Sequence, residues 1–498
     1  MLARSVVTCI GENKQEHCGY CNHRDPSSAS YSFGIWSYVL DVEHYNDLLD
    51  RGMRRSGKYL YKPIIAKTCC PQYTIRLNVA KFHISKPQRK VLRQMNGFLI
   101  KDKKPTLIVE DMVQKADNQK DGKNSSGTLI NRNLRNVDDE TAVTSNVVLR
   151  EEGAEIPGSD VTGNKKLPVK KKSSNKEEME GKVDSKNSLQ RQSKKKEIRK
   201  QKALEKMRSK GIDIEEAFRL RAEKEARREK TLDTYINEYY NQKETALHKL
   251  EVELVLVKSS KFVETEHEAF NLFYKYQTTV HLETSCTKEG FDNFLCNSPL
   301  QSALCGNSVS RLIIIKRKPF GSYHMQYRLD GKLIAVGVID ILPRCVSSKY
   351  FFYDPDYKFL SMGTYSALRE IYLTKTLSRK NPGLDYYYMG YYIESCPKMR
   401  YKSHFHPSDL LCDTSFTWVP FDECKKQLTK SDRVIAFAKN VPSASKVSYG
   451  SMLCMYNRKL GRYCQLPREP EVVEMKYQVK EYANIVGPVG QEMVLFLK

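Results

Sequence analysis

Hydrophobic and polar positions repeat with a helical period in the segment 85–99. Ser85 precedes Lys86 and Pro87, and the apolar residues that follow are Val91, Leu92, Met95, Phe98 and Leu99. A serine before the first turn caps free backbone N–H groups, and proline is tolerated at the first helical positions. The spacing predicts a capped amphipathic helix whose basic residues lie off the apolar face.

A strand pattern dominates between residues 327 and 353. The dipeptide Asp330-Gly331 separates two apolar runs, which is a strong hairpin signal. A further β-rich run covers 346–353, and after a turn the segment 364–377 has apolar residues at helical spacing. Strands that lead into a helix in this order are typical of the acetyltransferase-like α+β fold, although many other α+β proteins share the order.

Composition divides the chain into four parts. Residues 1–112 mix apolar, aromatic and polar positions and predict a small α+β domain. Residues 113–190 have almost no aromatics and cannot bury enough surface to offset chain entropy, so they predict a disordered charged linker. The narrow apolar stripe in 191–250 predicts a charged helical extension. Residues 251–498 predict a second, larger globular domain.

The chain is strongly basic, with a formal net charge of +24 over 498 residues. Such an excess points to a polyanionic partner, most often nucleic acid, unless one lysine-rich tract dominates the sum. One basic cluster is interleaved with tyrosines, where cations can hold phosphates while the rings stack on bases. A second cluster lies on the predicted helix, and its alternative interpretation is a solvated helix face. The candidate nucleic-acid contacts are Arg54, Arg55, Lys58, Lys62, Arg89 and Lys90.

The cysteines indicate a reducing compartment. The chain has 14 of them and begins without the apolar core of a secretory signal. No run approaches the roughly 20 apolar residues that span a bilayer. We expect a soluble cytoplasmic monomer without a membrane partner, and the lysine-rich tract 194–202 as a candidate nuclear address.

Four cysteines form the strongest local motif. Cys18 and Cys21 are two residues apart, and the adjacent pair Cys69 and Cys70 follows some fifty residues later. Adjacent cysteines do not easily bridge each other, so the four are expected to serve one metal or cluster. Zinc is the default for four thiolates, and an iron–sulfur cluster uses similar ligands. The alternative is a set of buried apolar thiols.

One carboxylate interrupts an apolar strand pattern. Asp340 lies within the second half of the predicted hairpin. A buried carboxylate costs several kcal/mol unless it is paired. Asp340 is therefore expected to face a site, a solvated edge or a basic partner, and the alternative to a functional role is a structural ion pair.

Several longer segments resemble eukaryotic arginyl-tRNA–protein transferases. The resemblance lies in Cys18–Cys21, Asp50–Pro63, Cys69–Arg76, 327–370 and Gly390–Lys402. It implies an enzyme that transfers arginine from arginyl-tRNA to the α-amino group of proteins beginning with Asp, Glu or oxidised Cys, creating N-degrons for ubiquitin-dependent degradation. It also implies an acetyltransferase-like (GNAT-like) C-terminal domain, an iron–sulfur cluster or zinc at the four cysteines, and an association with haem. The long lysine-rich insert departs from the simplest family pattern.

The implied reaction needs little base catalysis. Aminoacyl-tRNA is an activated ester, and an α-amino group has a pKa of about 7.7 to 8.0. Catalysis should come from positioning the amine and stabilising the oxyanion. The candidate catalytic residues are Asp340 or Asp354, as the proton acceptor or as the group that orients the amine, with Tyr353, Ser361 and the amides around Gly363 near the reacting carbonyl.

Substrate binding requires charges of both signs. An acidic acceptor side chain needs cations, which Lys398, Arg400 and Lys402 offer behind Tyr391 and Tyr392, although the same cations suit the acceptor end of tRNA. The guanidinium of the donor needs a carboxylate, for which the candidates are Asp356, Glu370 and Glu394.

Two rival functions remain at this stage. A non-catalytic RNA-binding protein with a zinc-thiolate module explains the charge and the cysteines, but it gives Asp340 and the 390–402 segment no task. A coenzyme A-dependent acetyltransferase needs a glycine-rich turn, whereas 360–363 holds a single glycine. We therefore expect no coenzyme A.

Overall fold

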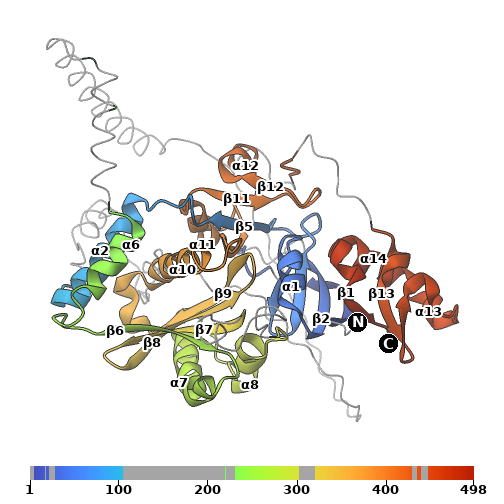
Figure 1. The fold of residues 1–498 in the computed structure, drawn as a ribbon, viewed down its shortest axis with the longest axis horizontal. Coiled ribbons are helices and arrows are strands. Elements are labelled where there is room, and N and C mark those ends of the chain that lie inside the picture. The colour runs from blue at the N-terminus through green and yellow to red at the C-terminus, as the bar shows by residue number, and fades with distance from the viewer. Residues whose placement is uncertain are drawn as a thin grey trace, which may run out of the picture. The chain divides into compact units, whose positions relative to one another are not determined.

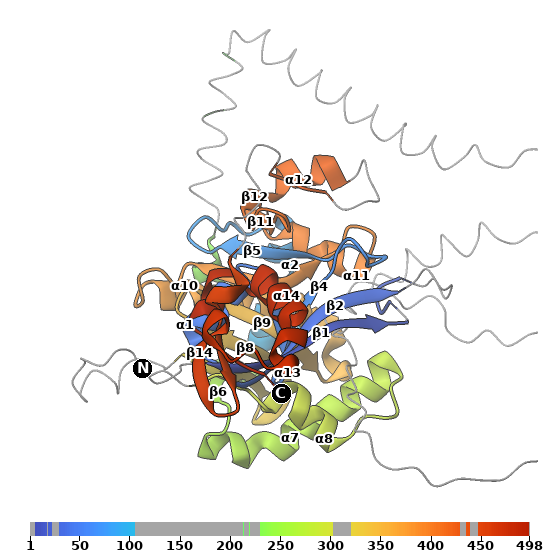
Figure 2. The same ribbon diagram turned by 90° about the vertical axis from the view of Figure 1, so that its right-hand side faces the viewer.

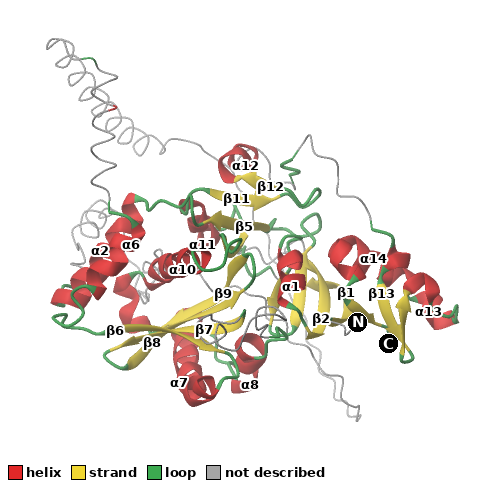
Figure 3. Cartoon of the chain, viewed as in Figure 1, coloured by secondary structure: helices red, strands yellow, loops and turns green. Residues whose placement is uncertain are grey.

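The computed structural model describes residues 5–16, 18–21, 29–104, 213, 219, 230–301, 320–428, 435–438 and 447–497. The expected linker, most of the expected helical extension and the lysine-rich tract lie outside these residues. Apart from 213, 219 and 230, the described ranges belong to one compact unit. This unit is an α+β fold with two mixed sheets, as the sequence predicted for its class (Figures 1 and 3). Among the described helices none is long and apolar enough to cross a bilayer.

The first sheet joins the two ends of the chain. Its seven strands, in spatial order, are β14 (Lys459–Arg462), β13 (Leu453–Tyr456), β15 (Val494–Phe496), β1 (Val6–Gln15), β2 (Ser30–Val39), β4 (Tyr59–Pro63) and β3 (Arg54–Ser56). β15 runs parallel to β1, with Val494 opposite Val6. Helices α1 (Val42–Leu49), α13 (Pro470–Glu474) and α14 (Lys476–Val486) accompany this sheet, and α14 packs against β1 (Figure 2).

The second sheet has eight strands. Their spatial order is β12 (Trp418–Pro420), β11 (Ser408–Leu411), β5 (Tyr73–Asn78), β10 (Tyr386–Tyr392), β9 (Cys345–Tyr353), β8 (Lys332–Ile341), β7 (Gly321–Leu329) and β6 (Leu250–Leu256). β10 runs parallel to β9 and antiparallel to β5. Residues 1–112 and residues 251–498, which were expected to form two domains, therefore each contribute strands to both sheets.

Helices cover both faces of the second sheet. α7 (Ser260–Tyr276) and α8 (Lys288–Phe291) cover one face, where Phe273 packs on Phe352 with ring centroids 5.4 Å apart (Figure 1). α10 (Met362–Ser378) covers the other face, and α6 (Leu232–Tyr240) packs against α2 (Lys86–Lys101). The remaining described helices are α11 (Pro397–Arg400), α12 (Phe421–Leu428), and the short turns η2 (Gln277–His281), η3 (Asp292–Cys296), η4 (Pro355–Leu360), η5 (Tyr401–His404), η6 (Tyr449–Ser451), η7 (Tyr463–Gln465) and η8 (Gly487–Gln491).

The local predictions are confirmed. Ser85 and Gln88 form a reciprocal capping box at the start of α2. Asp330 and Gly331 adopt φ values of 50° and 86° between β7 and β8, the left-handed pair that a two-residue hairpin turn requires. The predicted strand 346–353 is β9, and the predicted helix 364–377 lies within α10.

Candidate active site and thiolate centre

The four N-terminal cysteines come together. Their sulfurs all lie within 4.8 Å of one another, and the Sγ atoms of Cys21 and Cys69 are 3.7 Å apart. Ligands at 2.3 Å around a tetrahedral zinc ion have sulfurs about 3.8 Å apart, so the spacing fits a four-thiolate centre. Cys18 and Cys70 are buried, whereas Cys69 is exposed. Iron–sulfur clusters use the same donor set, and the geometry suits both.

The protein favours thiolate at one of these sulfurs, whereas burial raises the pKa of Cys69 to about 12 and the hydrogen bond with Cys18 raises the pKa of Cys70. A hydrogen bond from Cys70, together with the backbone N–H groups of Tyr20 and Cys21, lowers the pKa of the Cys18 thiol to about 5. Thiolate is the form that binds metal. The sulfurs also contact the segment after β10, because Cys18 and Cys70 pack with Cys396 and Met399. The centre thus lies against the segment that carries the predicted cations Lys398, Arg400 and Lys402.

Strands β9 and β10 separate in the middle of the second sheet. Their parallel pairing runs from Cys345 opposite Tyr386 to Ser347 opposite Tyr388. Within these two described strands the pairing goes no further: β9 continues along β8, and β10 continues along β5 with an irregularity between Tyr388 and Tyr391. We call this place the strand opening.

A buried carboxylate lies beside the strand opening. Glu370 of α10 is fully buried and accepts hydrogen bonds from Tyr387 of β10 at 2.7 Å and from Ser366 at 3.2 Å. Ser348 of β9 is a further hydrogen-bond partner, and burial raises the pKa of Glu370 to about 6. Glu370 therefore links both strands at the point where they part.

Two cations satisfy carbonyl groups of β10 beyond the opening. Gly390, with φ of 78°, has its carbonyl oxygen 3.3 Å from Nη2 of Arg54. The carbonyl oxygen of Tyr391 accepts from Nζ of Lys402 at 2.8 Å. Since buried carbonyls need partners, these two side chains satisfy backbone groups of β10 where it no longer pairs with β9.

Asp340 forms an ion pair with a basic residue, which was the structural alternative to a functional role. The carboxylate is fully buried and is bound by Nε of Arg55 at 2.8 Å and also by Nη2. Arg55 further donates to the hydroxyl of Ser322 at 2.7 Å and to the carbonyl oxygen of Gly57 at 3.0 Å. This pair ties β3 of the first sheet to β8 of the second. The proton-acceptor role of Asp340 and the nucleic-acid role of Arg55 stay predictions.

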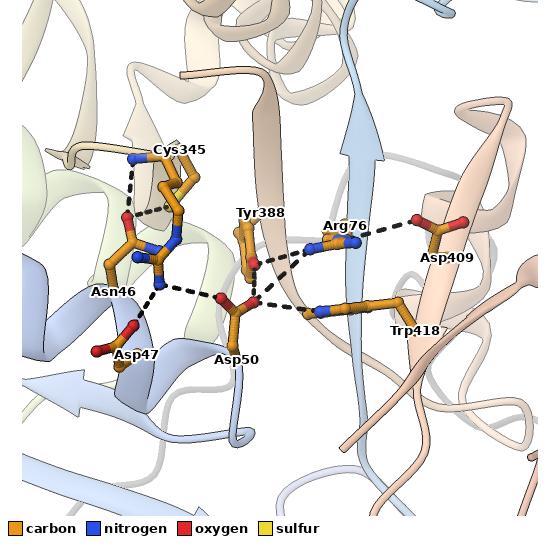
Figure 4. Close-up of polar contacts among 9 residues, drawn as sticks. Asn46, Asp47, Asp50, Arg76, Cys345, Tyr388, Asp409 and Trp418 are labelled. Carbon is orange, nitrogen blue, oxygen red and sulfur yellow. Dashed lines mark hydrogen bonds and ion pairs between the residues drawn. The ribbon is translucent and has the colours of Figure 1, made fainter. Parts of the chain in front are cut away.

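A second network joins the sheets around Asp50, at the end of α1 (Figure 4). Its carboxylate accepts from the hydroxyl of Tyr388, from Nε1 of Trp418 at 3.2 Å and from Arg344 at 3.2 Å. Arg76 of β5 lies 3.7 Å from the same carboxylate, between two aromatic rings. The network fixes the ring of Tyr388 at the strand opening.

The other predicted catalytic residues lie around η4 and the start of α10. Asp354 is buried and pairs with Lys275 and with Lys332, the latter at 2.8 Å. The ring of Tyr353 is buried with its centroid 5.2 Å from that of Tyr276. Ser361 adopts a left-handed conformation before α10. Gly363 lies in the first turn of α10.

The predicted binding residues divide into buried and exposed groups. Tyr391 and Tyr392 are buried in β10, and the hydroxyl of Tyr392 donates to Glu394. Lys62 is buried beside Asp413. Exposed or half-buried cations are Lys58, Arg89, Lys90, Lys398 and Arg400. The structure does not bring all these cations to one place.

Sequence reasoning missed one charged group. The Nζ atom of Lys349 in β9 is buried and has no hydrogen-bond partner among the described residues. Burial, with the charge of Arg55 nearby, lowers the pKa of Lys349 to about 7. The signal was present, because a lysine interrupts an aromatic strand pattern much as Asp340 interrupts its own.

Comparison with known proteins gives one consistent result. Family models described as the N terminus and the C terminus of arginine-tRNA-protein transferase match residues 16–90 and 268–412. Arginyl-tRNA–protein transferase 1 of Drosophila melanogaster is 36% identical over 446 residues, covering 85% of this chain and 83% of the relative. Arginyl-tRNA–protein transferase 2 of Arabidopsis thaliana is 35% identical over 512 residues, covering 90% and 79%.

A solved structure shows a much weaker likeness. The C-terminal domain of a putative lysylphosphatidylglycerol synthetase from Agrobacterium fabrum has a TM-score of 0.22 and 12% identity. The match covers 38% of this chain and 51% of the synthetase chain. A likeness this weak carries no argument about the fold.

Proposed function

The chain belongs to the arginyl-tRNA–protein transferase family, and from this premise we propose that it arginylates proteins whose first residue is Asp, Glu or oxidised Cys. The family resemblance of the sequence is thereby confirmed, and the chain is an aminoacyltransferase. We further propose that its products are N-degrons for ubiquitin-dependent degradation, and that it works as a cytoplasmic monomer with a nuclear pool.

The strand opening is the observation that carries the proposed site. The separation of β9 and β10 beyond Ser347 and Tyr388, with Glu370 of α10 packed against both strands, is the arrangement expected of an acetyltransferase-like domain. We place the aminoacyl ester at this opening. No coenzyme A is needed, because the ester of the tRNA is already activated.

The reaction at the opening conserves atoms without an added reagent. The α-amino nitrogen of the acceptor forms a bond with the ester carbonyl carbon, and the bond from that carbon to the ribose oxygen breaks. The amine proton ends on the released ribose hydroxyl. Glu370 fixes Tyr387 and Ser348 on the two sides of the opening and is a positioning residue. Proximity supplies most of the rate.

An exposed basic surface near the opening suits the tRNA. α2 begins beside η5, since Nε2 of Gln88 donates to the carbonyl oxygen of His404 at 3.2 Å. This contact brings Lys90 and Arg89 of α2 to the same region as Lys398 and Arg400 of α11. Exposed cations hold phosphates without reading sequence.

The thiolate centre supports the segment after β10. Bound zinc or an iron–sulfur cluster would hold Cys18, Cys21, Cys69 and Cys70 in one fixed arrangement. Cys70 also accepts a weak hydrogen bond from Ser395 at 3.9 Å. We propose that a filled centre keeps the 393–402 segment in its working position.

Transfer of labelled arginine tests the proposal. Purified protein, prepared without oxygen, is mixed with charged tRNA and peptides that begin with Asp, Glu or Gly. Label on the Asp and Glu peptides alone is the expected result. Bound tRNA without label on any peptide would favour a non-catalytic RNA-binding protein, and equal label on all three would remove the acidic specificity.

A further inference from the structure

A buried arginine beside the strand opening has unused hydrogen-bond donors. Arg54 begins β3 and is 6% exposed. Its guanidinium carbon lies 5.3 Å from the ring centroid of Tyr388 and 5.6 Å from that of Tyr391, and Nη2 donates to the carbonyl oxygen of Gly390. Nε and Nη1 are buried without a hydrogen-bond partner among the described residues.

Arg54 also lacks a counter-charge. Within the described part of the chain, no carboxylate oxygen forms an ion pair with it. The neighbouring residue shows the contrast, because Arg55 is equally buried and uses all three of its nitrogens on Asp340, Ser322 and Gly57. A buried charge with free donors is costly, and the two tyrosine rings offset that cost only in part.

We propose that Arg54 binds the side-chain carboxylate of the acceptor's first residue and so determines acidic specificity. The inference rests on the proposed function, because it names the group that recognises the proposed acceptor. A carboxylate supplies the missing negative charge and accepts hydrogen bonds from guanidinium N–H groups. Arg54 contacts Gly390, which lies just beyond the strand opening, so a short acidic side chain bound there keeps its α-amine near the ester.

The two tyrosine rings beside Arg54 are held at their hydroxyl ends. The hydroxyl of Tyr388 donates to Asp50, and the hydroxyl of Tyr391 donates to the carbonyl oxygen of Gly52 at 3.0 Å. Rings fixed at their far ends hold Arg54 in one orientation. A backbone phosphate is a poorer occupant, since an enclosed guanidinium suits a small side chain, whereas the exposed Lys398 and Arg400 suit tRNA.

The test is the ratio of kcat/KM for a peptide that begins with Asp to that for the same peptide beginning with Asn. We expect the wild-type ratio to be large. In Arg54→Gln the ratio should fall by about 30-fold or more, because a charge-assisted hydrogen bond is lost. In Arg54→Lys, which keeps the charge but loses the planar fork, the ratio should fall by less.

Arg369 offers a matched control. It is also 6% exposed and lies beside Tyr240 and Tyr365, between α6 and α10; its Nε has no partner among the described residues, but Nη1 and Nη2 both donate to those two hydroxyls. Arg369→Gln should therefore leave the Asp to Asn ratio unchanged. The ratio is insensitive to the amount of active protein, so partial unfolding of a variant does not mimic the expected result.

Three outcomes would overturn the inference. An unchanged ratio in Arg54→Gln shows that other residues read the acidic group. Weaker tRNA binding with an unchanged ratio assigns Arg54 to a phosphate. A wild-type enzyme that does not distinguish Asp from Asn defeats the proposed acidic specificity itself. If neither variant folds, a structure of the wild-type enzyme with an Asp-peptide decides, because a carboxylate away from Arg54 rejects the proposal.

Discussion

Glu370 keeps a carboxylate where water cannot reach it. Three hydroxyl groups donate to it, yet burial still raises its pKa from 4.5 to about 6. The folded protein therefore holds this proton more tightly than the unfolded chain does. By linkage, the free energy of unfolding falls as the pH rises from about 4.5 to 6 and stays lower above that range. Between these two pKa values, each pH unit lowers the free energy of unfolding by about 1.4 kcal/mol.

We predict that Glu370→Gln removes this pH dependence. An amide stays neutral, and its oxygen still accepts from Tyr387. The difference in the free energy of unfolding between variant and wild type should shift by about 2 kcal/mol in favour of the variant between pH 4.5 and pH 7. Urea denaturation at both pH values measures it. The same difference at both would show that Glu370 titrates normally.

The four thiols make a second residue-scale prediction. Because they lie within 4.8 Å of one another, loss of any one should remove most of the bound metal. Cys69→Ser is the sharpest variant, since Cys69 is exposed and its replacement disturbs little packing. Cys464 is exposed too and serves as the matched control. Metal and sulfide analysis of protein purified without oxygen should show full loading for Cys464→Ser and a small fraction for Cys69→Ser.

Full loading of Cys69→Ser would exclude the four-thiolate centre. The same analysis separates the two cofactors, because iron with inorganic sulfide indicates a cluster and zinc alone indicates a structural zinc site.

At the scale of elements, β8 and α10 approach closely over a single glycine. A Cβ atom added at Gly337 would lie 2.9 Å from Oε1 of Glu370. That carboxylate is fixed by Tyr387 and Ser366, so it does not move aside freely. Gly363, in the first turn of α10, has nothing within 4 Å of an added Cβ.

We predict that Gly337→Ala lowers the free energy of unfolding by about 1 to 3 kcal/mol, as overpacking does in a filled core. Gly363→Ala should leave it unchanged or raise it slightly, because alanine is the better helix former. Urea denaturation of the two variants at one pH gives the comparison. Equal stabilities would mean that α10 shifts outward without cost.

Elements that depend on neighbours in sequence were predictable. The cap of α2 and the turn of the β7–β8 hairpin are each determined by a few neighbouring residues. The position of β5 between β10 and β11 is not, because strand pairing at that distance depends on contacts that no local pattern encodes. The thiol centre could be predicted for the same reason, because its cysteines are spaced as a local motif. The unpaired donors of Arg54 could not, because they depend on the contact between β3 and β10.

At the scale of the whole molecule, neither residues 1–112 nor residues 251–498 can form either sheet completely without the other. Without the C-terminal range, β1 loses its neighbour β15, and β5 loses β10 and β11. Without the N-terminal range, β10 and β11 lose the strand between them, whose residues Tyr73, Ile75 and Leu77 are at most 1% exposed. Full burial of each such side chain contributes about 1.5 to 3 kcal/mol.

We predict that fragments 1–112 and 230–498 do not fold separately but form a native complex when they are co-expressed. Each fragment alone exposes the apolar faces that the other covers, and strand edges that the other pairs. Co-purification, circular dichroism and a single cooperative thermal transition of the pair would support this. A cooperative transition for 1–112 alone would instead show an independent N-terminal domain. The contacts of β5 and Arg54 with β10 would then form by docking of two finished domains, rather than by the folding of one interleaved core.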